Sequence, residues 1–318
     1  MLHYKKTPAL KIFHSINDFN STKKTILTLG TFDGVHIGHE KILKKITQNT
    51  ENHKYESVVL TFFPHPRMVL KEYSDIKLLN TIEEKISLLE KIGIENLVIH
   101  PFDEAFSRLT AEDFVTTVLV DRLHIKKIII GHDHRFGRNR TANIDDLIAF
   151  GKQYDFEVEQ ISVQEINAIS VSSTKIRNAL LEGDMALANE YLGYEYFLTG
   201  TIVEGKQLGR AINFPTANLK IEESYKLIPQ NGVYIVKSVI NGKTVFGMMN
   251  IGFNPTVDGQ NQSIEIHYFD FNADLYNQKI SVSILQRIRS EQKFGSVDLL
   301  KEQLEKDKQT ALTYLNKF

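Results

Sequence analysis

The chain has 318 residues, with 38 Lys and Arg against 39 Asp and Glu, and it contains no cysteine. This length predicts two domains, the balanced charge disfavours a nucleic-acid-binding protein, and the lack of cysteine excludes disulfides, thiolate nucleophiles and Fe–S clusters. No apolar run approaches the roughly 18 residues that a membrane span needs, and the first residues lack a signal-type apolar core. We therefore expect a cytoplasmic protein that does not bind membranes, and a homo-oligomer is compatible with its sequence.

The first half of the chain alternates between short β-rich runs and amphipathic stretches. The predicted strands are Thr25–Leu29, Ser57–Phe62, Asn96–His100, Lys127–Gly131 and Phe156–Ile161, and the predicted helices are His39–Gln48, Thr81–Ile92, Ala111–Leu123 and Ile144–Tyr154. This alternation predicts βαβ units, and therefore a parallel sheet with helices on both faces. In such sheets, ligands bind beyond the carboxyl ends of the strands.

The second half has the period-2 pattern of an antiparallel sheet or barrel. Its predicted strands are Phe197–Glu204, Gly232–Ile240, Lys243–Asn250, Ser263–Phe269 and Lys279–Gln286, and a final helix is expected over Ser296–Asn316. The dipeptide Asn241-Gly242 is a strong hairpin signal. A helical stretch that ends at Leu192-Gly193 separates the two patterns, and we place the domains at residues 1–188 and 189–318.

The most informative segment, Gly30–His39, leaves the first strand and opens the first helix. Glycines let the backbone approach a ligand, and a helix start offers free N–H groups to a phosphate. His36 and His39 flank Gly38 in an H-x-G-H pattern, which is moderately specific on its own. Two surface histidines on a loop are the alternative. The candidate nucleotide-binding residues here are Gly30, Phe32, Asp33, Gly34 and Gly38, with the two histidines.

Three further polar segments follow other predicted strands. His65 lies between two prolines that stiffen its loop, although a structural turn is equally plausible. The segment 131–140 carries Asp133, Arg135 and two more arginines, which suit a phosphate or, alternatively, a solvated basic loop. Ser172, Ser173, Thr174 and Arg177 open a helix, where hydroxyl groups cap N–H groups and the arginine adds positive charge. Each segment alone has an ordinary structural explanation, but four of them at one sheet edge favour a nucleotide site.

The second half carries its own candidates. Gly205 and Gly209 suggest a flexible flap, and Arg210 could reach a phosphate. Thr216 and Asn218 are two residues apart, so they share a face on an extended strand, and their oxygens suit Mg²⁺ alongside nucleotide phosphates. Glu265 lies in an alternating strand and is either a solvated surface residue or a general base.

These motifs resemble those of the bacterial bifunctional riboflavin kinase/FMN adenylyltransferase family, also called FAD synthetases. In the first half the resemblance rests on G-T-F-D-G-V-H-I-G-H, T-F-F-P-H-P, G-H-D-H-R-F-G and S-S-T-K-I-R. In the second half it rests on G-R-A-I-N-F-P-T-A-N, G-V-Y, N-I-G-F-N-P-T, E-I-H-Y-F-D-F and R-S-E-Q-K-F. The motifs occur in the family's order from about Thr25 to Phe294.

The resemblance implies a Rossmann-like nucleotidyltransferase domain followed by a riboflavin-kinase β-barrel with a C-terminal helix. The substrates would be riboflavin, FMN and ATP, with FAD as product, Mg²⁺ as metal and no covalent enzyme intermediate. Glu265 would be the kinase base, with Thr216 and Asn218 at Mg²⁺. His36 and His39 would contact the ATP phosphates. The other implied ligand-binding residues include Pro215, Asn250 and Arg287 in the second half, and Ser173, Thr174 and Arg177 for pyrophosphate in the first.

Three residues depart from the family pattern. Asn213 and Asn277 replace glycines, but Asn tolerates a positive φ and could keep the turns. His134 replaces an aromatic residue, which leaves adenylyl transfer the less secure activity. Three alternatives stay open. The chain could have only one of the two activities, or it could be a flavin-binding module without turnover. The least favoured alternative is a nucleic-acid binder that uses the arginine loop.

Overall fold

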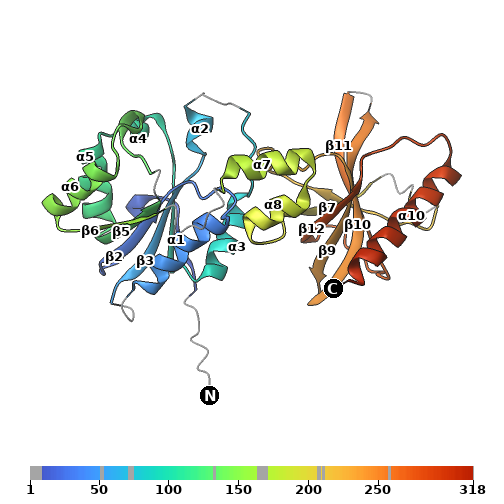
Figure 1. Cartoon of the computed structure of the whole chain (residues 1–318), viewed down its shortest axis with the longest axis horizontal. Helices are drawn as coiled ribbons and strands as arrows, with labels where there is room; N and C mark the ends of the chain where they lie inside the picture. The colour runs from blue at the N-terminus through green and yellow to red at the C-terminus, as the bar shows by residue number, and fades with distance from the viewer. Residues whose placement is uncertain are drawn as a thin grey trace, which may run out of the picture. The chain divides into compact units, whose positions relative to one another are not determined.

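A computed structural model describes residues 9–50, 54–70, 75–131, 134–162, 171–205, 209, 212–256 and 259–317, with the side chains of 254–256 and 259–261 excepted. The chain forms two compact units, Met1–Ser172 and Ser173–Phe318, which we describe separately (Figure 1). Within the described residues, no helix is long and apolar enough to cross a membrane.

The first unit is built on a six-stranded parallel sheet with the order β1-β4-β3-β2-β5-β6. From the central strand β2, the chain adds β3 and then β4 on one side of the sheet. It then crosses to the other side of β2, where it adds β5 and then β6. The order of the strands therefore reverses between β2 and β5, where the crevice beyond the strand ends is a typical ligand site. The strands are β1 (Lys11–Phe13), β2 (Thr25–Leu29), β3 (Glu56–Phe62), β4 (Asn96–His100), β5 (Ile125–Gly131) and β6 (Glu157–Ile161).

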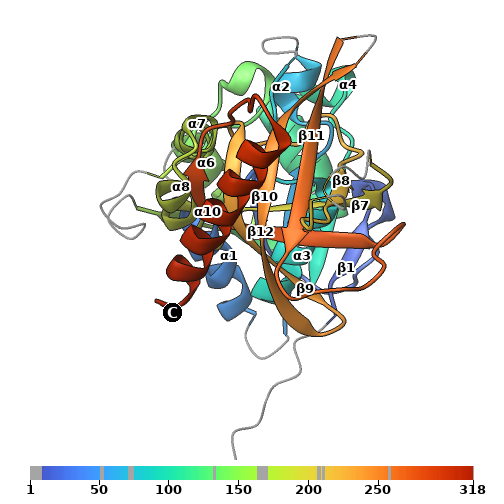
Figure 2. The ribbon, with the colours of Figure 1, turned by 90° about the vertical axis from the view of Figure 1, so that its right-hand side faces the viewer.

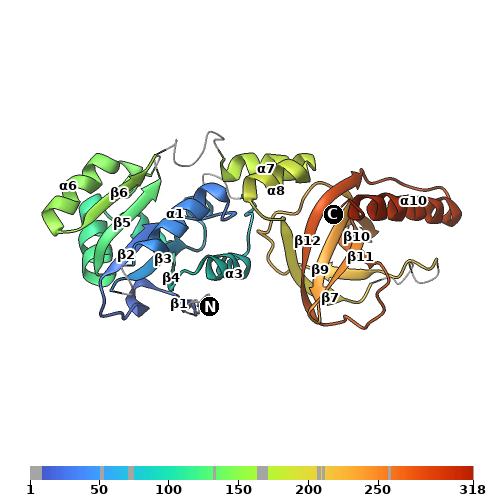
Figure 3. The ribbon, with the colours of Figure 1, turned by 60° about the horizontal axis from the view of Figure 1, so that its bottom comes forward.

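Helices cover both faces of this sheet, as predicted. Figure 3 shows α1 along one face, where it packs on β2, β3 and β5. The helical segments of this unit are η1 (Ile16–Asp18), α1 (Ile37–Gln48), α2 (Pro66–Val69), α3 (Ile82–Ile92), α4 (Glu104–Ser107), α5 (Ala111–Asp113), η2 (Phe114–Arg122), η3 (Arg138–Arg140) and α6 (Ile144–Tyr154). The bounds of β2, β4 and α6 are those that the sequence predicts, and a capping box formed by Thr81 and Glu84 opens α3.

The predicted helix over Ala111–Leu123 is only partly α-helical. After α5, it continues as the π-helix η2, whose end is closed by a hydrogen bond from Leu123 N–H to the Val118 carbonyl at 3.0 Å. The hydroxyl groups of Thr116 and Thr117 bond back to the carbonyls of Glu112 and Asp113 at 2.9 and 2.6 Å. Such side-chain bonds compete for the backbone acceptors, which gives a physical reason for the altered hydrogen-bond pattern.

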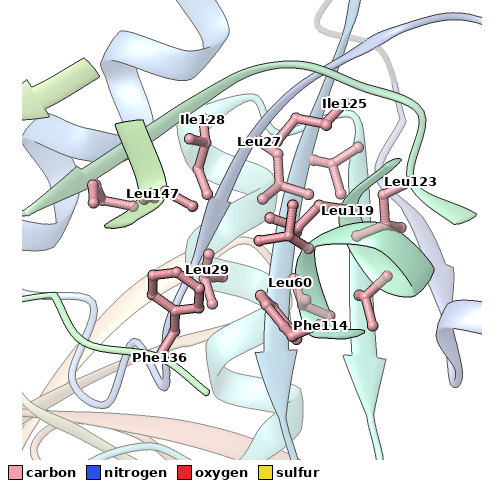
Figure 4. Close-up of a cluster of buried hydrophobic side chains, with 14 of the residues drawn as sticks. Leu27, Leu29, Leu60, Phe114, Leu119, Leu123, Ile125, Ile128, Phe136 and Leu147 are labelled. Atoms are coloured by element: carbon pink, nitrogen blue, oxygen red, sulfur yellow. The ribbon is translucent and has the colours of Figure 1, made fainter. Parts of the chain in front are cut away.

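A buried apolar cluster lies between the other sheet face and the segments η2 and α6 (Figure 4). Leu27 and Leu60 from the central strands meet Leu119 from η2, and none of the three has exposed surface. The central strands are buried on both faces, as is usual for a parallel sheet. This rigid core supports the loops that leave the carboxyl ends of β2 and β3.

The second unit begins with two short helices and continues as a closed antiparallel barrel with the order β10-β11-β8-β7-β12-β9. The prediction of a sheet or barrel is thus resolved as a barrel. Its elements are α7 (Ser173–Glu182), α8 (Met185–Leu192), β7 (Phe197–Val203), β8 (Ala217–Lys220), β9 (Gly232–Ile240), β10 (Lys243–Thr256), β11 (Gly259–Tyr268), β12 (Lys279–Arg289) and α10 (Val297–Leu315). The four-residue strand β8 is the one barrel strand absent from the predicted set.

Three turns of the barrel depend on a positive φ. Asn241 and Gly242 have φ values of 51° and 76° and join β9 to β10, so the predicted hairpin is confirmed. Asn213 and Asn277 have φ values of 63° and 62°. The two asparagines therefore adopt the left-handed conformation that the turns need, which the sequence predicted as possible.

The C-terminal helix α10 packs along the barrel beside β10 (Figure 2). Its buried Ala311 joins an apolar cluster with Val233, Ile235 and Met248 of the neighbouring strands. The guanidinium of Arg289 on β12 also binds the carboxylate of the buried Asp307 of α10, with N–O distances from 2.8 to 3.0 Å. The helix is thus fixed to the barrel by both apolar packing and a multiply bonded ion pair.

Candidate active sites

The loop between β2 and α1 has an unusual backbone. Phe32 and Val35 have φ values of 45° and 39°, and Gly34 has a φ of 91°. A positive φ is rare for a β-branched residue such as valine and costs about 1–3 kcal/mol. Both side chains are buried, at 3% exposure each, so packing holds the backbone in this shape. Strain of this kind is concentrated at functional sites.

The loop brings the two predicted histidines together. The rings of His36 and His39 are stacked, with centroids 3.6 Å apart, and the edge of Phe32 lies against His39 at 5.2 Å. His36 is also the N-cap of α1, and its Nδ1 accepts the His39 backbone N–H at 3.4 Å. Because Nδ1 is an acceptor, the proton of the neutral ring is on Nε2. That N–H is the one hydrogen-bond donor of the neutral ring.

Burial keeps both imidazoles neutral. It lowers the pKa of His36 to about 4, although the charge of Asp33 opposes the shift. Burial, together with the neighbouring His36 ring and the positive charge of Lys85, lowers the pKa of His39 well below its usual range. Within the described part of the chain, His39 Nδ1 is buried without a hydrogen-bond partner. A buried polar atom without a partner carries a free-energy cost that a bound ligand could remove.

Asp33 and Gly38 lie in the same loop, but their contacts are structural. The carboxylate of Asp33 is 2% exposed and accepts the Leu79 backbone N–H at 2.8 Å. Gly38 is buried in the first turn of α1. Gly30 lies directly after β2, where its Cα faces the Phe32 ring. These residues shape the histidine loop, and their direct contact with nucleotide stays a prediction.

The other predicted residues of the first unit differ in their placement. His65 is the N-cap of α2 and accepts the Arg67 N–H at 3.1 Å, which is the structural turn that we considered as its alternative. His134 keeps an aromatic contact, because its ring stacks on Phe136 at 6.3 Å. Arg135 is exposed. Asp133 lies outside the described residues.

The predicted hydroxyl-rich helix start is present in α7, which begins at Ser173. By its packing α7 belongs to the second unit, since the Gln230 N–H binds the Leu180 carbonyl at 3.0 Å. The predicted domain limit at 188 and 189 falls within α8. The assignment of Ser172, Ser173, Thr174 and Arg177 to pyrophosphate stays a prediction.

The second candidate site is a row of polar side chains across three barrel strands. Glu265 on β11 pairs with Asn218 on β8 and, on its other side, with Asn250 on β10. The hydroxyl of Thr216 donates to the Glu265 carboxylate at 3.3 Å. Directly paired residues on neighbouring strands have adjacent side chains on the same face. The barrel thus brings together four of the predicted residues, which come from three motifs of the sequence.

Close backbone packing supports this row. A Cβ atom on Gly205 would collide with the side-chain amide of Asn218, so glycine lets the backbone approach this side chain in its present position. A Cβ on Gly209 would likewise collide with the Phe214 carbonyl. The exposed Pro215 uses its carbonyl to bind His267 Nδ1 at 2.9 Å. Arg210 lies outside the described residues.

Arg287 occupies a different place from the Glu265 row. Its guanidinium donates to the Asn231 carbonyl at 2.8 Å and to the Ser290 hydroxyl at 3.2 Å. Its buried Nε has no hydrogen-bond partner among the described residues. Gly183 and Gly232 make room for this side chain, since a Cβ on either would lie within 3 Å of it. A ligand role for Arg287 stays a prediction.

Lys85 was not among the predicted site residues, although its charge lies beside the histidine loop. It is the fourth residue of α3 and is 4% exposed. Its ammonium donates to the Thr31 carbonyl at 2.7 Å. The signal that could have found it is the position of a lysine one residue after the capping-box glutamate, where a helix start is ordinarily acidic rather than basic.

Comparison with known proteins agrees with both halves of this description. Residues 18–175 match the family model for FAD synthetase, and residues 192–315 match the model for riboflavin kinase. These two matches define a two-domain flavin-nucleotide transferase, with a nucleotidyltransferase domain before a kinase barrel.

Relatives extend the match over nearly the whole chain. Bifunctional riboflavin kinase/FMN adenylyltransferases from Buchnera aphidicola subsp. Schizaphis graminum and from Bacillus subtilis are both 38% identical, and they cover 95% and 92% of this chain and 97% and 93% of their own. The chain belongs to the bifunctional riboflavin kinase/FMN adenylyltransferase family. It therefore carries both activities, the ATP-dependent phosphorylation of riboflavin and adenylyl transfer to FMN.

A solved structure has the same fold. The crystal structure of a Streptococcus pneumoniae protein described as a macrolide-efflux protein is 32% identical, with a TM-score of 0.85, and the match covers 95% of this chain and 98% of that one. Its description names a different function from that of the curated relatives. The agreement in fold extends over both units of the chain.

Proposed function

We propose that Glu265 is the general base of the kinase reaction. The carboxylate would take the proton of the riboflavin 5′-hydroxyl as its oxygen attacks the γ-phosphorus of ATP, and ADP would leave. The observation that supports this role is the position of Glu265 between Asn218 and Asn250, with Thr216 at hydrogen-bond distance. A carboxylate that neighbouring polar groups orient can accept a proton from a hydroxyl group held beside it.

A divalent metal accompanies ATP in this family of reactions, and we propose Mg²⁺ held by Thr216 and Asn218. Their hydroxyl and amide oxygens are the hard donors that Mg²⁺ prefers. No group of three or more His, Cys, Asp or Glu in the described ranges could hold a metal. This fits an ion that takes most of its remaining ligands from phosphates and water. When bound, Mg²⁺ supplies charge neutralisation for the transferring phosphoryl group.

For adenylyl transfer, we propose that His36 and His39 donate hydrogen bonds to the ATP phosphates. The phosphate of FMN would attack the α-phosphorus, and pyrophosphate would leave. The attacking group is already anionic, so the site needs donors rather than a strong base. Two stacked, neutral imidazoles beside a helix N-terminus supply such donors.

The remaining assignments complete the proposal. We propose substrate contacts for residues that the described geometry does not join to either site. We also propose a domain limit between residues 188 and 189, a cytoplasmic location, and small-molecule partners without nucleic acid. The contact residues in this group are His65, Asp133, Arg135, Ser172, Ser173, Thr174, Arg177, Arg210, Pro215 and Arg287.

The metal role of Thr216 is tested by Thr216→Val, which removes the hydroxyl while keeping the branched shape. We expect FMN formation to require about tenfold more Mg²⁺, because the lost oxygen ligand is replaced only by water. Thr199→Val on β7 is the matched control, since that hydroxyl bonds Ser281 on the same barrel. An unchanged Mg²⁺ requirement in Thr216→Val would remove this residue from the metal site.

A further inference from the structure

The histidine loop is held from the start of α3 by two separate contacts. The Leu79 backbone N–H binds the Asp33 carboxylate at 2.8 Å, and the Lys85 ammonium binds the Thr31 carbonyl at 2.7 Å. The Thr61 hydroxyl donates to the same carbonyl at 3.3 Å. The strained turn between Thr31 and His36 is therefore anchored on both sides of Phe32.

The charges at this anchor matter because the site must accept a polyanion. Asp33 is 2% exposed, and a buried carboxylate next to phosphate-binding groups repels the phosphates with little screening by solvent. Lys85 is close enough for the two charges to interact, since Asp33 raises the pKa of Lys85 while burial lowers it. Lys85 also lies near His39, whose pKa its charge lowers. The two imidazoles are neutral and do not cancel the Asp33 charge.

We propose that Lys85 is a positioning residue for adenylyl transfer, which anchors the histidine loop through Thr31 and cancels the charge of Asp33 beside the ATP phosphates. Without the ammonium, the loop would keep the Thr61 contact but would lose both the Thr31 anchor and the positive charge near Asp33 that favours the incoming ATP. Loss of Lys85 should thus weaken ATP binding in FAD synthesis more than it slows the chemical step. This inference rests on the proposed role of His36 and His39.

The proposal predicts a pH dependence with a definite sign. Burial lowers the pKa of Lys85 to about 8, so its positive charge is lost as the pH rises through that value. Three titratable groups surround Lys85: Asp33 in the loop, His39 on α1, and Glu84, which directly precedes Lys85 in the chain. From β3, the uncharged Thr61 faces Lys85. His39 stays neutral throughout this range. The KM for ATP in FAD formation should therefore rise between about pH 7 and about pH 9.5.

The test compares FAD formation from FMN in the wild-type enzyme, Lys85→Met, Lys85→Arg and the double variant Asp33→Asn/Lys85→Met. We expect Lys85→Met to raise the KM for ATP about tenfold or more, with a smaller effect on kcat and no effect on FMN formation. Lys85→Arg should keep the wild-type KM and lose its rise at high pH, because arginine stays charged. Asp33→Asn keeps the acceptor for Leu79, so the double variant should recover most of the affinity.

Two results would overturn the proposal. The first is a KM for ATP in Lys85→Met that equals the wild-type value. The second is a loss of ATP affinity in Lys85→Met that the added Asp33→Asn change does not relieve, because Lys85 would then act only as structural support. If Lys85→Met fails to fold, the wild-type pH profile decides, because a flat KM across that range contradicts the charge role. A His36→Asn variant that still forms FAD would instead refute the histidine assignment, so the two failures are distinguishable.

Discussion

Replacing Glu265 with Gln is expected to reduce the kcat of FMN formation by about 10²- to 10⁴-fold, the usual contribution of a general base. Glutamine keeps the size of the side chain and an oxygen that can accept the Thr216 hydroxyl bond at this position. The barrel should therefore fold normally, while the group that takes the riboflavin proton is lost. The measurement is the single-turnover rate of FMN formation from riboflavin and ATP.

The matched control for Glu265→Gln is Glu222→Gln. Glu222 lies just after β8, is exposed and pairs with Lys220 at the surface, with an N–O distance of 2.9 Å. The same chemical change there should leave FMN formation unchanged. A near-normal kcat in Glu265→Gln would remove Glu265 from the base role and leave the polar row as a binding surface.

Replacing His36 with Asn is expected to lower FAD formation by about 10²- to 10³-fold, the cost of a lost preorganised donor to the transition state. Asparagine is chosen because it is a good N-cap and keeps an oxygen to accept the His39 N–H. Helix α1 should thus start normally, and the loss can be assigned to the missing Nε2–H. FAD formation from supplied FMN and ATP is the quantity to measure.

The kinase barrel provides an internal control for this variant, because FMN formation should continue at the wild-type rate. His14→Ala offers a second control, since His14 is an exposed histidine of the same unit. If FMN and FAD formation fall together in a folded His36→Asn protein, the assignment of separate sites is wrong.

Periodicity and turn chemistry were enough to predict most of the fold. The buried strands β2 and β4 and the helix α6 have end signals that coincide with their observed bounds, and Asn241-Gly242 placed a hairpin correctly. The short edge strand β1 was missed, because three partly exposed residues carry no usable period and depend on pairing with β4. The π-helical η2 could not be separated from an α-helix by an apolar pattern.

The candidate sites were predictable to the extent that their residues lie in local motifs. His36 and His39 are three positions apart across a strand–helix turn. Glu265 and Asn218 lie on adjacent strands, and Thr216 directly precedes the strand of Asn218. Lys85 was not predictable, because it reaches the loop over a sequence separation of 54 residues. His65 has its imidazole engaged in a cap, a contact that the sequence offered only as an alternative.

The most direct test of two independent sites is to mix the two variants, each of which lacks one activity and keeps the other. Glu265→Gln alone should leave riboflavin unconverted, and His36→Asn alone should stop at FMN. A mixture of the two, given riboflavin, ATP and Mg²⁺, should produce FAD, because FMN made by one protein is adenylylated by the other. Chromatography of the flavins detects all three compounds. FAD in the mixture is the expected result, and its absence, with both proteins folded, would contradict the two-site account.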